Sequence, residues 1–194
     1  MPLNITTALE RIIADASERI PAFRHIEPER LLVCLSSTRS GGIHGTYAKI
    51  HPLRFAGGAV STEVRRGRRR YTCTMPTITH NQREILYLVY FLVPRFLNLS
   101  LREKLVTIFH ELYHISPEFN GDIRRFPGRN YAHGSSKKAY NQRIEELVTA
   151  YLLQEPDAEL LATLNGSMLE LRARHRSLIG RRFPAPRLQL TPAS

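Results

Sequence analysis

The first hydrophobic pattern along the chain has a helical period. Apolar side chains recur every three or four residues near the N-terminus, at Leu9, Ile12, Ile13, Ala16 and Ile20. This spacing places them on one face of an α-helix. The sequence T-A-L-E at positions 7–10 is a capping-box pattern, and Pro21 disfavours helical geometry in the residue before it. We therefore predict an amphipathic helix that begins near Thr7 and ends before Pro21.

Strand patterns dominate the rest of the first half. Four apolar or alternating runs have the length and composition of strands, at residues 31–35, 46–53, 71–75 and 85–93. The turn-rich residues 36–42 separate the first two, which predicts that these two pair as a hairpin. The run at 85–93 is rich in β-branched and aromatic residues, so it indicates a strongly buried strand.

Helical patterns return in the second half. Ser100 and Glu103 form a second capping box, and Pro117 limits the helix that follows, so this helix is expected to end near Ser116. Residues 117–135 are rich in Gly, Pro, Asn, Asp and Arg, which predicts a long irregular loop, and loops of this length are usually functional or disordered. Further helices are predicted over residues 136–154 and 158–174.

Together these elements indicate an α+β fold in which a small, mostly antiparallel sheet packs on the 100–116 helix and further helices follow. The chain of 194 residues is long enough for one well-buried domain. We assign this domain to residues 1–175, and we regard residues 176–194 as a basic, Pro-containing C-terminal tail.

The predicted helix at 100–116 carries the clearest chemical motif. Residues 110–114 read His-Glu-Leu-Tyr-His, an HExxH sequence. Positions i and i+4 of a helix face the same way, so His110 and His114 can bind one metal ion. Glu111 lies one residue round from His110 and can reach a water bound to that ion. The motif therefore predicts a Zn²⁺ site with Glu111 as general base.

A catalytic zinc ion needs a third protein ligand. His133 is the first candidate, because it lies at the end of the irregular loop and Gly134 lets the backbone approach closely. Glu145 on the next helix is the second candidate, since gluzincin peptidases take their third ligand from a downstream helical glutamate. Asp122 is the third, although Gly121-Asp122 is equally typical of a turn.

The region from residue 94 to residue 140 resembles a family of metallopeptidases found in phage and in prophage-bearing bacterial genomes. The resemblance is carried by P-R-F at 94–96, T-I-F-H-E-L-Y-H-I at 107–115, G-D-I-R-R at 121–125 and H-G-S at 133–135. It implies a zincin-like fold with an HExxH helix and His133 as third ligand. It names no substrate, and the arginine-rich tail has no clear counterpart in the family.

The motif and the resemblance together predict metal-assisted hydrolysis of peptide bonds in a peptide or protein substrate. In zincins the substrate commonly lies extended along a sheet edge above the HExxH helix, and the strand at 46–53 or at 85–93 would form that edge. A further group must stabilise the oxyanion. Tyr131 is preferred for this role over Tyr113, Arg124 and Arg125.

The net charge of +11 suggests a second class of function. Much of the excess lies in Arg65, Arg66, Arg68, Arg69 and Arg70, and in six arginines between positions 172 and 187. A solvated turn and a loose tail are one interpretation of these runs. The other is a nucleic-acid-associated protein, for example a DNA-linked protease of the SprT type, whose arginines neutralise phosphates.

The remaining sequence features narrow the setting. Cys34 and Cys73 are the two cysteines and neither lies in a CxxC pair, which argues against a disulfide framework or a thiolate metal site. The longest apolar run is far shorter than the roughly 20 residues that span a bilayer, so no membrane partner is expected. The first residues do not resemble a signal peptide, so we expect a cytoplasmic protein.

Overall fold

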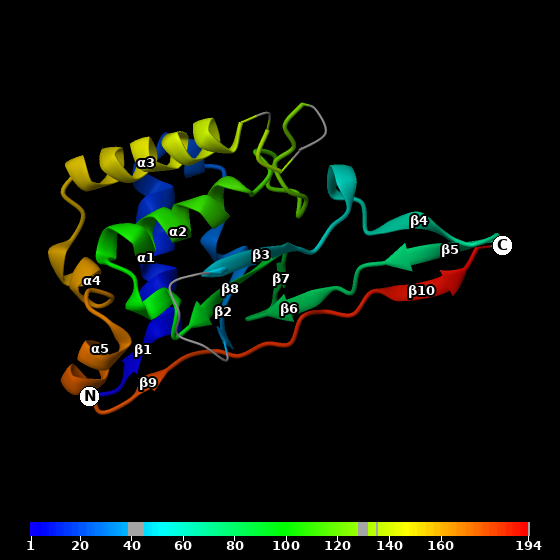
Figure 1. The fold of residues 1–194 in the computed structure, drawn as a ribbon. Coiled ribbons are helices and arrows are strands. Elements are labelled where there is room, and N and C mark those ends of the chain that lie inside the picture. The colour runs from blue at the N-terminus through cyan, green and yellow to red at the C-terminus, as the bar shows by residue number, and fades with distance from the viewer. Residues whose placement is uncertain (39–44, 128–131, 135, 194) are drawn as a thin grey trace.

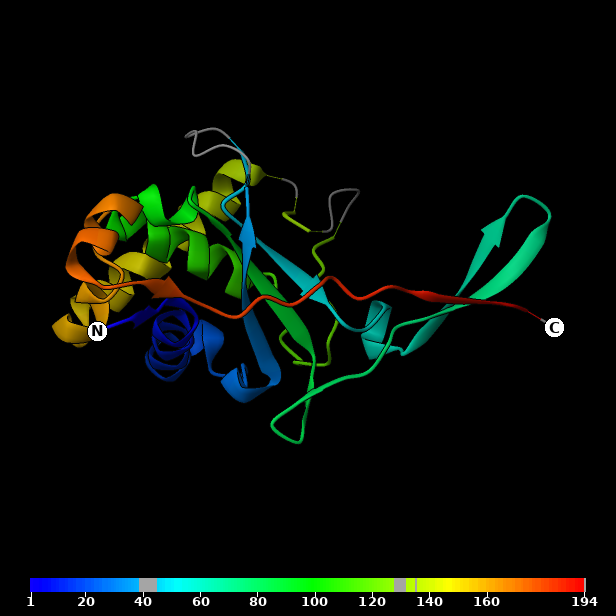
Figure 2. The same cartoon turned by 90° about the horizontal axis from the view of Figure 1, so that it is seen from below.

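The computed structural model describes residues 1–38, 45–127, 132–134 and 136–193. Figure 1 shows a body, in which helices pack on a sheet, and an arm of three strands that extends away from the helices. Figure 2 shows the same separation in a second view. The fold is therefore α+β, as the sequence predicts, with several small sheets.

The helices of the body come from both ends of the chain. They are α1 (Ile5–Arg19), α2 (Leu101–Tyr113), α3 (Lys137–Leu153), α4 (Ala158–Ala162) and α5 (Met168–Arg174). Short 3-10 helices occur at Pro21–Phe23, Pro28–Arg30, Ala56–Gly58 and Phe96–Asn98. The face of α1 that carries Leu9, Ile12 and Ile13 is buried, in agreement with the predicted periodicity.

The sheet of the body has the strand order β2-β8-β3. Strand β2 (Leu31–Ser37) runs parallel to β8 (Tyr87–Val93) over seven residues, whereas β3 (Ala48–Pro52) runs antiparallel to β8. The predicted hairpin of the first two strands is thus wrong. The reason is burial: β8 is buried on both faces over Tyr87–Phe91, and a strand of this kind lies at the centre of a sheet with a neighbour on each side.

Each face of this sheet is covered. The large core joins one face, through Val33, Val89 and Phe91, to the buried faces of α1, α2 and α3. A smaller cluster on the other face contains Leu32, Cys34, Leu88 and Tyr90, with Phe183 from the C-terminal segment packed against it. This second face also meets the hairpin of β6 (Ile78–His80) and β7 (Arg83–Ile85) through Ile78 and Ile85.

The arm is the antiparallel sheet β10-β5-β4. Strands β4 (Ser61–Arg66) and β5 (Arg69–Thr74) form a hairpin with a two-residue loop, and β10 (Gln189–Pro192) pairs with residues 71–74 of β5. The backbone at Gly67 has a φ of 61°, as the first loop position of a type II′ turn requires. The arm therefore joins two parts of the chain that are more than one hundred residues apart.

The interpretation of the arginine run at 172–187 as a loose tail is wrong, because most of it lies in or between ordered elements. Strand β9 (Leu178–Ile179) pairs parallel to β1 (Leu3–Asn4), and β10 completes the arm. Between them, the backbone oxygen of Arg181 accepts a hydrogen bond from the Leu35 amide, and the Arg181 guanidinium forms an ion pair with Glu10. The C-terminal segment is held in place because its backbone forms hydrogen bonds with the rest of the chain and Arg181 forms an ion pair with Glu10.

Two helix predictions also need correction. Helix α1 begins at Ile5, with Asn4 as its N-cap, because Ile5 is fully buried and belongs to the core face. The helix predicted over 158–174 is two helices, α4 and α5. Gly166, with a φ of 109°, lies between them, and Ser167 starts a new capping box.

Within the described residues, none of the helices combines the length and the apolar character that a membrane crossing requires.

Candidate metal centre

Helix α2 positions the HExxH motif. Ser100 and Glu103 form the predicted capping box, with both reciprocal hydrogen bonds present. The residues Leu105, Ile108, Phe109 and Leu112 are fully buried in the core and fix the rotation of the helix. The helix ends at Tyr113, three residues earlier than predicted, but the C-cap His114 keeps helical dihedral angles. His110 and His114 therefore retain their relation of one helical turn.

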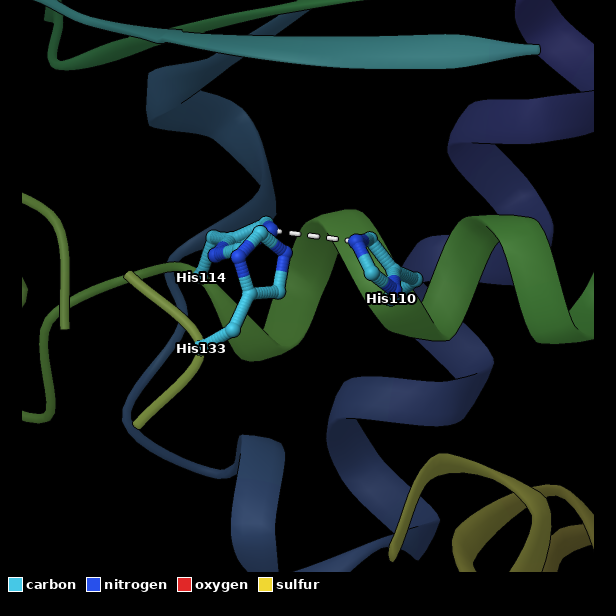
Figure 3. Close-up of side chains that lie close together, drawn as sticks. All are labelled: His110, His114 and His133. Atoms are coloured by element: carbon cyan, nitrogen blue, oxygen red, sulfur yellow. Dashed lines mark hydrogen bonds between the residues drawn. The ribbon is translucent and has the colours of Figure 1, made fainter. Parts of the chain in front are cut away.

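The structure brings His110, His114 and His133 together. The Nε2 atoms of His110 and His114 are 3.1 Å apart, and one ring nitrogen from each of the three residues lies within 4.8 Å of the others. Two nitrogens bound to one tetrahedral zinc ion are about 3.3 Å apart, so the first pair is already close to this spacing. Figure 3 shows the two helical rings on one side of α2, with His133 reaching them from the loop.

The protonation of the histidines suits metal binding. Burial lowers the pKa of His110 to about 4 and that of His114 to about 3. The pKa of His133 is also lowered, first by burial and then by the charge of Lys137. The rings of His110 and His114 are therefore neutral at pH 7, and a neutral imidazole has the lone pair that a metal ion needs.

Glu111 follows His110 on α2 and is buried, with only 7% of its surface exposed. Burial raises the pKa of its carboxyl to about 7, although a hydrogen bond from the backbone of Ile50 acts in the opposite direction. This residue links α2 to strand β3. A carboxyl with a pKa near neutrality can both accept and donate a proton at the pH of a cell.

The end of α2 is fixed by the loop that follows. The Arg124 amide donates to the backbone oxygen of His114 at 2.6 Å, and Arg124 Nε donates to the backbone oxygen of Tyr113 at 2.8 Å. The backbone oxygen of Ala132 accepts a hydrogen bond from the His114 ring. The hydrogen bond to Ala132 orients the imidazole of His114, as an outer partner of a metal-binding histidine does. The positive charge of Arg124 is favourable at the C-terminus of α2, where the helix dipole is negative.

The other two candidates for third ligand have different roles. The carboxylate of Glu145 is half exposed and lies 2.8 Å from the guanidinium of Arg102. Asp122 is buried and accepts hydrogen bonds from Arg125, from the Gly57 amide and from the Ile123 amide. Burial alone would raise the pKa of Asp122, but these hydrogen bonds hold it below its ordinary value. Asp122 therefore organises the loop.

Of the four residues considered for oxyanion stabilisation, three lie among the described residues. Tyr131 lies outside the described residues. Arg124 lies 4.3 Å above the ring of Tyr113, so these two side chains contact each other, and Arg125 forms an ion pair with Asp122.

Sequence reasoning missed Tyr140 of α3. Its buried ring lies 5.1 Å from the ring of His110, 5.4 Å from that of His114 and 4.9 Å from that of His133, measured between ring centroids. Its hydroxyl donates to the backbone oxygen of His110 at 3.3 Å. Burial, and then the nearby Glu111, raise the pKa of this phenol. The available signal was weak: Tyr140 precedes Ile144 and Leu147 on the apolar face of the predicted helix.

A pocket of about 450 Å³ opens next to His133. Its wall is largely aromatic and apolar, and it includes Tyr113, Phe126 and Tyr140 together with Arg143. The candidate metal centre thus adjoins a space that could hold an apolar side chain.

No family profile matches this chain, and comparison with curated proteins and with solved structures finds no match either. The resemblance to phage metallopeptidases consequently rests on the sequence motifs quoted above.

Proposed function

We propose that this protein is a zinc-dependent metallopeptidase. The observation that carries the proposal is the convergence of His110, His114 and His133, with the buried carboxyl of Glu111 on the same helix as two of them. Three neutral imidazoles that leave one position open are a ligand set of catalytic zinc sites. When bound there, zinc supplies Lewis-acid chemistry, since it lowers the pKa of a bound water to about 7 and polarises a carbonyl.

The chain itself supplies the proton transfers. Glu111 accepts the proton of the attacking water and passes it to the leaving amine, and its raised pKa suits both steps. The ring of Tyr140 and the backbone of Ala132 hold the imidazoles in position. Tyr131 remains the residue proposed to stabilise the oxyanion.

The substrate is proposed to be an extended peptide that adds to strand β3. This strand pairs with β8 on one side, and within the described residues its other side has no strand partner. The Ile50 amide points to that open side, because it donates to Glu111 and not to β8. A peptide that pairs with β3 would therefore pass directly over Glu111. An apolar substrate side chain would occupy the pocket beside His133.

A metal analysis combined with a peptidase assay tests this proposal. The purified protein should contain one zinc ion per chain and should hydrolyse an unfolded protein such as casein. Glu111→Gln should retain zinc and lose about 100-fold or more in rate, the lower range of a general base. Glu118→Gln, an exposed glutamate beyond the end of α2, is the matched control and should keep full activity. Absence of stoichiometric zinc, or unchanged hydrolysis by Glu111→Gln, would refute the proposal.

The same assay distinguishes the third ligand. His133→Ala should weaken zinc binding by more than the roughly 10- to 100-fold that loss of an outer hydrogen-bond partner causes. Glu145→Gln should leave zinc binding unchanged, since this carboxylate is paired with Arg102. The reverse result would assign the third ligand to Glu145.

A further inference from the structure

The tip of the arm gathers positive charge without any internal compensation. Its five arginines, Arg65, Arg66, Arg68, Arg69 and Arg70, are all exposed. The three strands of the arm contain a single acidic residue, Glu63. Among the described residues, no carboxylate lies within ion-pair distance of these five guanidinium groups.

Many arginines of the body behave differently. Eight of them form ion pairs with carboxylates: Arg19, Arg30, Arg54, Arg83, Arg102, Arg125, Arg143 and Arg181. The fold thus supplies carboxylate partners for these eight arginines, whereas the exposed arginines of the body without an ion pair in the described ranges, such as Arg11, Arg24 and Arg172, are spread along the chain. At the tip, five arginines within positions 65–70 lack a carboxylate partner among the described residues, so an anion from outside would find them together.

The strand register indicates that these arginines do not stabilise the hairpin. Arg65 lies directly opposite Arg70, and Arg66 lies directly opposite Arg69. Like charges in directly opposite positions destabilise a sheet. A polyanion bound at the tip would neutralise both pairs.

The same register determines which polyanion fits. Opposite residues share a face of the hairpin and successive residues alternate, so Arg65 and Arg70 point to one face while Arg66 and Arg69 point to the other. Arg68 lies in the loop between them. A flat anionic surface would meet one face only, whereas a groove between two phosphate backbones meets both.

The dimensions agree with such a groove. The distal part of the arm, up to Arg70, consists of two strands only, because β10 pairs with residues 71–74. The major groove of B-form DNA is about 12 Å wide and admits a two-stranded ribbon, whereas that of duplex RNA is too narrow. Both views show that the arm extends away from the helices, so the body would not collide with a duplex held at the tip (Figures 1 and 2).

We propose that the arm binds double-stranded DNA, with the β4–β5 tip in the major groove and its arginines on the phosphates. This binding site is separate from the metal centre and does not depend on peptide hydrolysis.

The proposal is tested by measuring the affinity of the full-length protein for a fluorescent 20-base-pair DNA duplex at several salt concentrations. Five phosphate contacts predict a slope of about −4.5 for log K against log salt, which is a loss of about 500-fold between 50 and 200 mM salt. Changing Arg65, Arg66, Arg68, Arg69 and Arg70 to Gln should abolish this binding. The matched control changes five exposed arginines of the body to Gln, namely Arg11, Arg24, Arg172, Arg176 and Arg182, and so removes the same charge.

The control variant should retain most of the affinity and nearly the full slope. A variant with five lysines at the tip should also keep the slope, because lysine carries the same charge as arginine. Urea unfolding of the glutamine variant, with an unchanged midpoint, would show that its loss of binding does not follow from misfolding. Equal losses in the tip variant and the control would overturn the proposal, because binding would then reflect net charge alone. Absence of binding at 50 mM salt, or tighter binding to duplex RNA or to anionic vesicles than to DNA, would also overturn it.

Discussion

Helix α2 buries two charged side chains, whereas the arm exposes its charged side chains to solvent. Lys104 and Glu111 lie inside the body, and each has a backbone partner: Lys104 Nζ donates to Leu164 O at 2.7 Å and to Gly166 O at 2.6 Å, and Glu111 accepts from Ile50. The arginines of the arm are exposed and have no carboxylate partner among the described residues. Burial excludes water, so a buried charge such as Lys104 must be satisfied by the chain itself. A charge on the arm can remain available to another molecule.

The largest expected effect is a loss of stability when a side chain is removed from the core of the body. Phe109 of α2 is fully buried and contacts Phe23 and Tyr151, with ring centroids 5.1 and 5.4 Å away. Phe109→Ala should lower the free energy of unfolding by about 3–5 kcal/mol, because it leaves a cavity in the core. Val64→Ala on the arm should lower it by less than about 1 kcal/mol. Urea denaturation measures both, and equal losses would show that the arm belongs to the same core.

The second prediction tests the buried charge. Lys104 is fully buried, and Lys104→Met should lower stability at pH 7 by about 1–3 kcal/mol, because the backbone oxygens of Leu164 and Gly166 lose their donor. Lys138→Met, on the exposed face of α3, should have almost no effect. Thermal and urea unfolding of both variants would decide the matter, and a Lys104→Met variant as stable as the unsubstituted protein would contradict it.

The pH dependence of stability gives a sharper comparison between the unsubstituted protein and Lys104→Met. Burial lowers the pKa of Lys104 from 10.5 to about 8. Between these two values the unfolded chain binds more protons than the folded chain, so the contribution of Lys104 to stability rises as pH increases from 8 to 10.5. The stability difference between the unsubstituted protein and Lys104→Met should therefore widen over this window. A constant difference would mean that the pKa of Lys104 is not lowered in the fold.

The smallest effect is expected at the tip of the arm, and its sign is opposite. Replacing Arg65 and Arg70 together by Thr removes a directly opposed pair of like charges and adds β-branched side chains. This double change should raise stability by about 0.2–1 kcal/mol at low salt. In 1 M salt the Debye length falls to about 3 Å, so most of the electrostatic gain should vanish. A loss of stability at low salt would show that these arginines support the hairpin.

Local sequence patterns predicted much of the candidate site. The capping box of Ser100 and Glu103, the apolar face of α2 and the HExxH spacing all operate within a few residues, so they can be recognised without knowledge of the rest of the fold. His133 was selected from its position at the end of a loop and its neighbour Gly134. The structure places its ring 4.8 Å from that of His114, between centroids.

Other features depend on contacts between distant parts of the chain. The alternation of residues 46–53 indicates a strand but not its partner, and β3 pairs with β8 because that buried strand needs a neighbour on each side. Tyr140 lies against three histidines only because α3 packs on α2. The C-terminal segment is ordered because Arg181 reaches Glu10 and β10 reaches β5.

By itself, the sequence determined the α+β class, the helix that carries His110, Glu111 and His114, and the position of the arginine cluster, because each depends on short-range periodicity or composition. Only the tertiary structure decided which strands pair, which aromatic ring supports the histidines, and that the five arginines project on an arm with no acidic partner among the described residues. The physical reason is that burial and charge pairing are summed over the whole molecule, and residues far apart in the chain contribute to both.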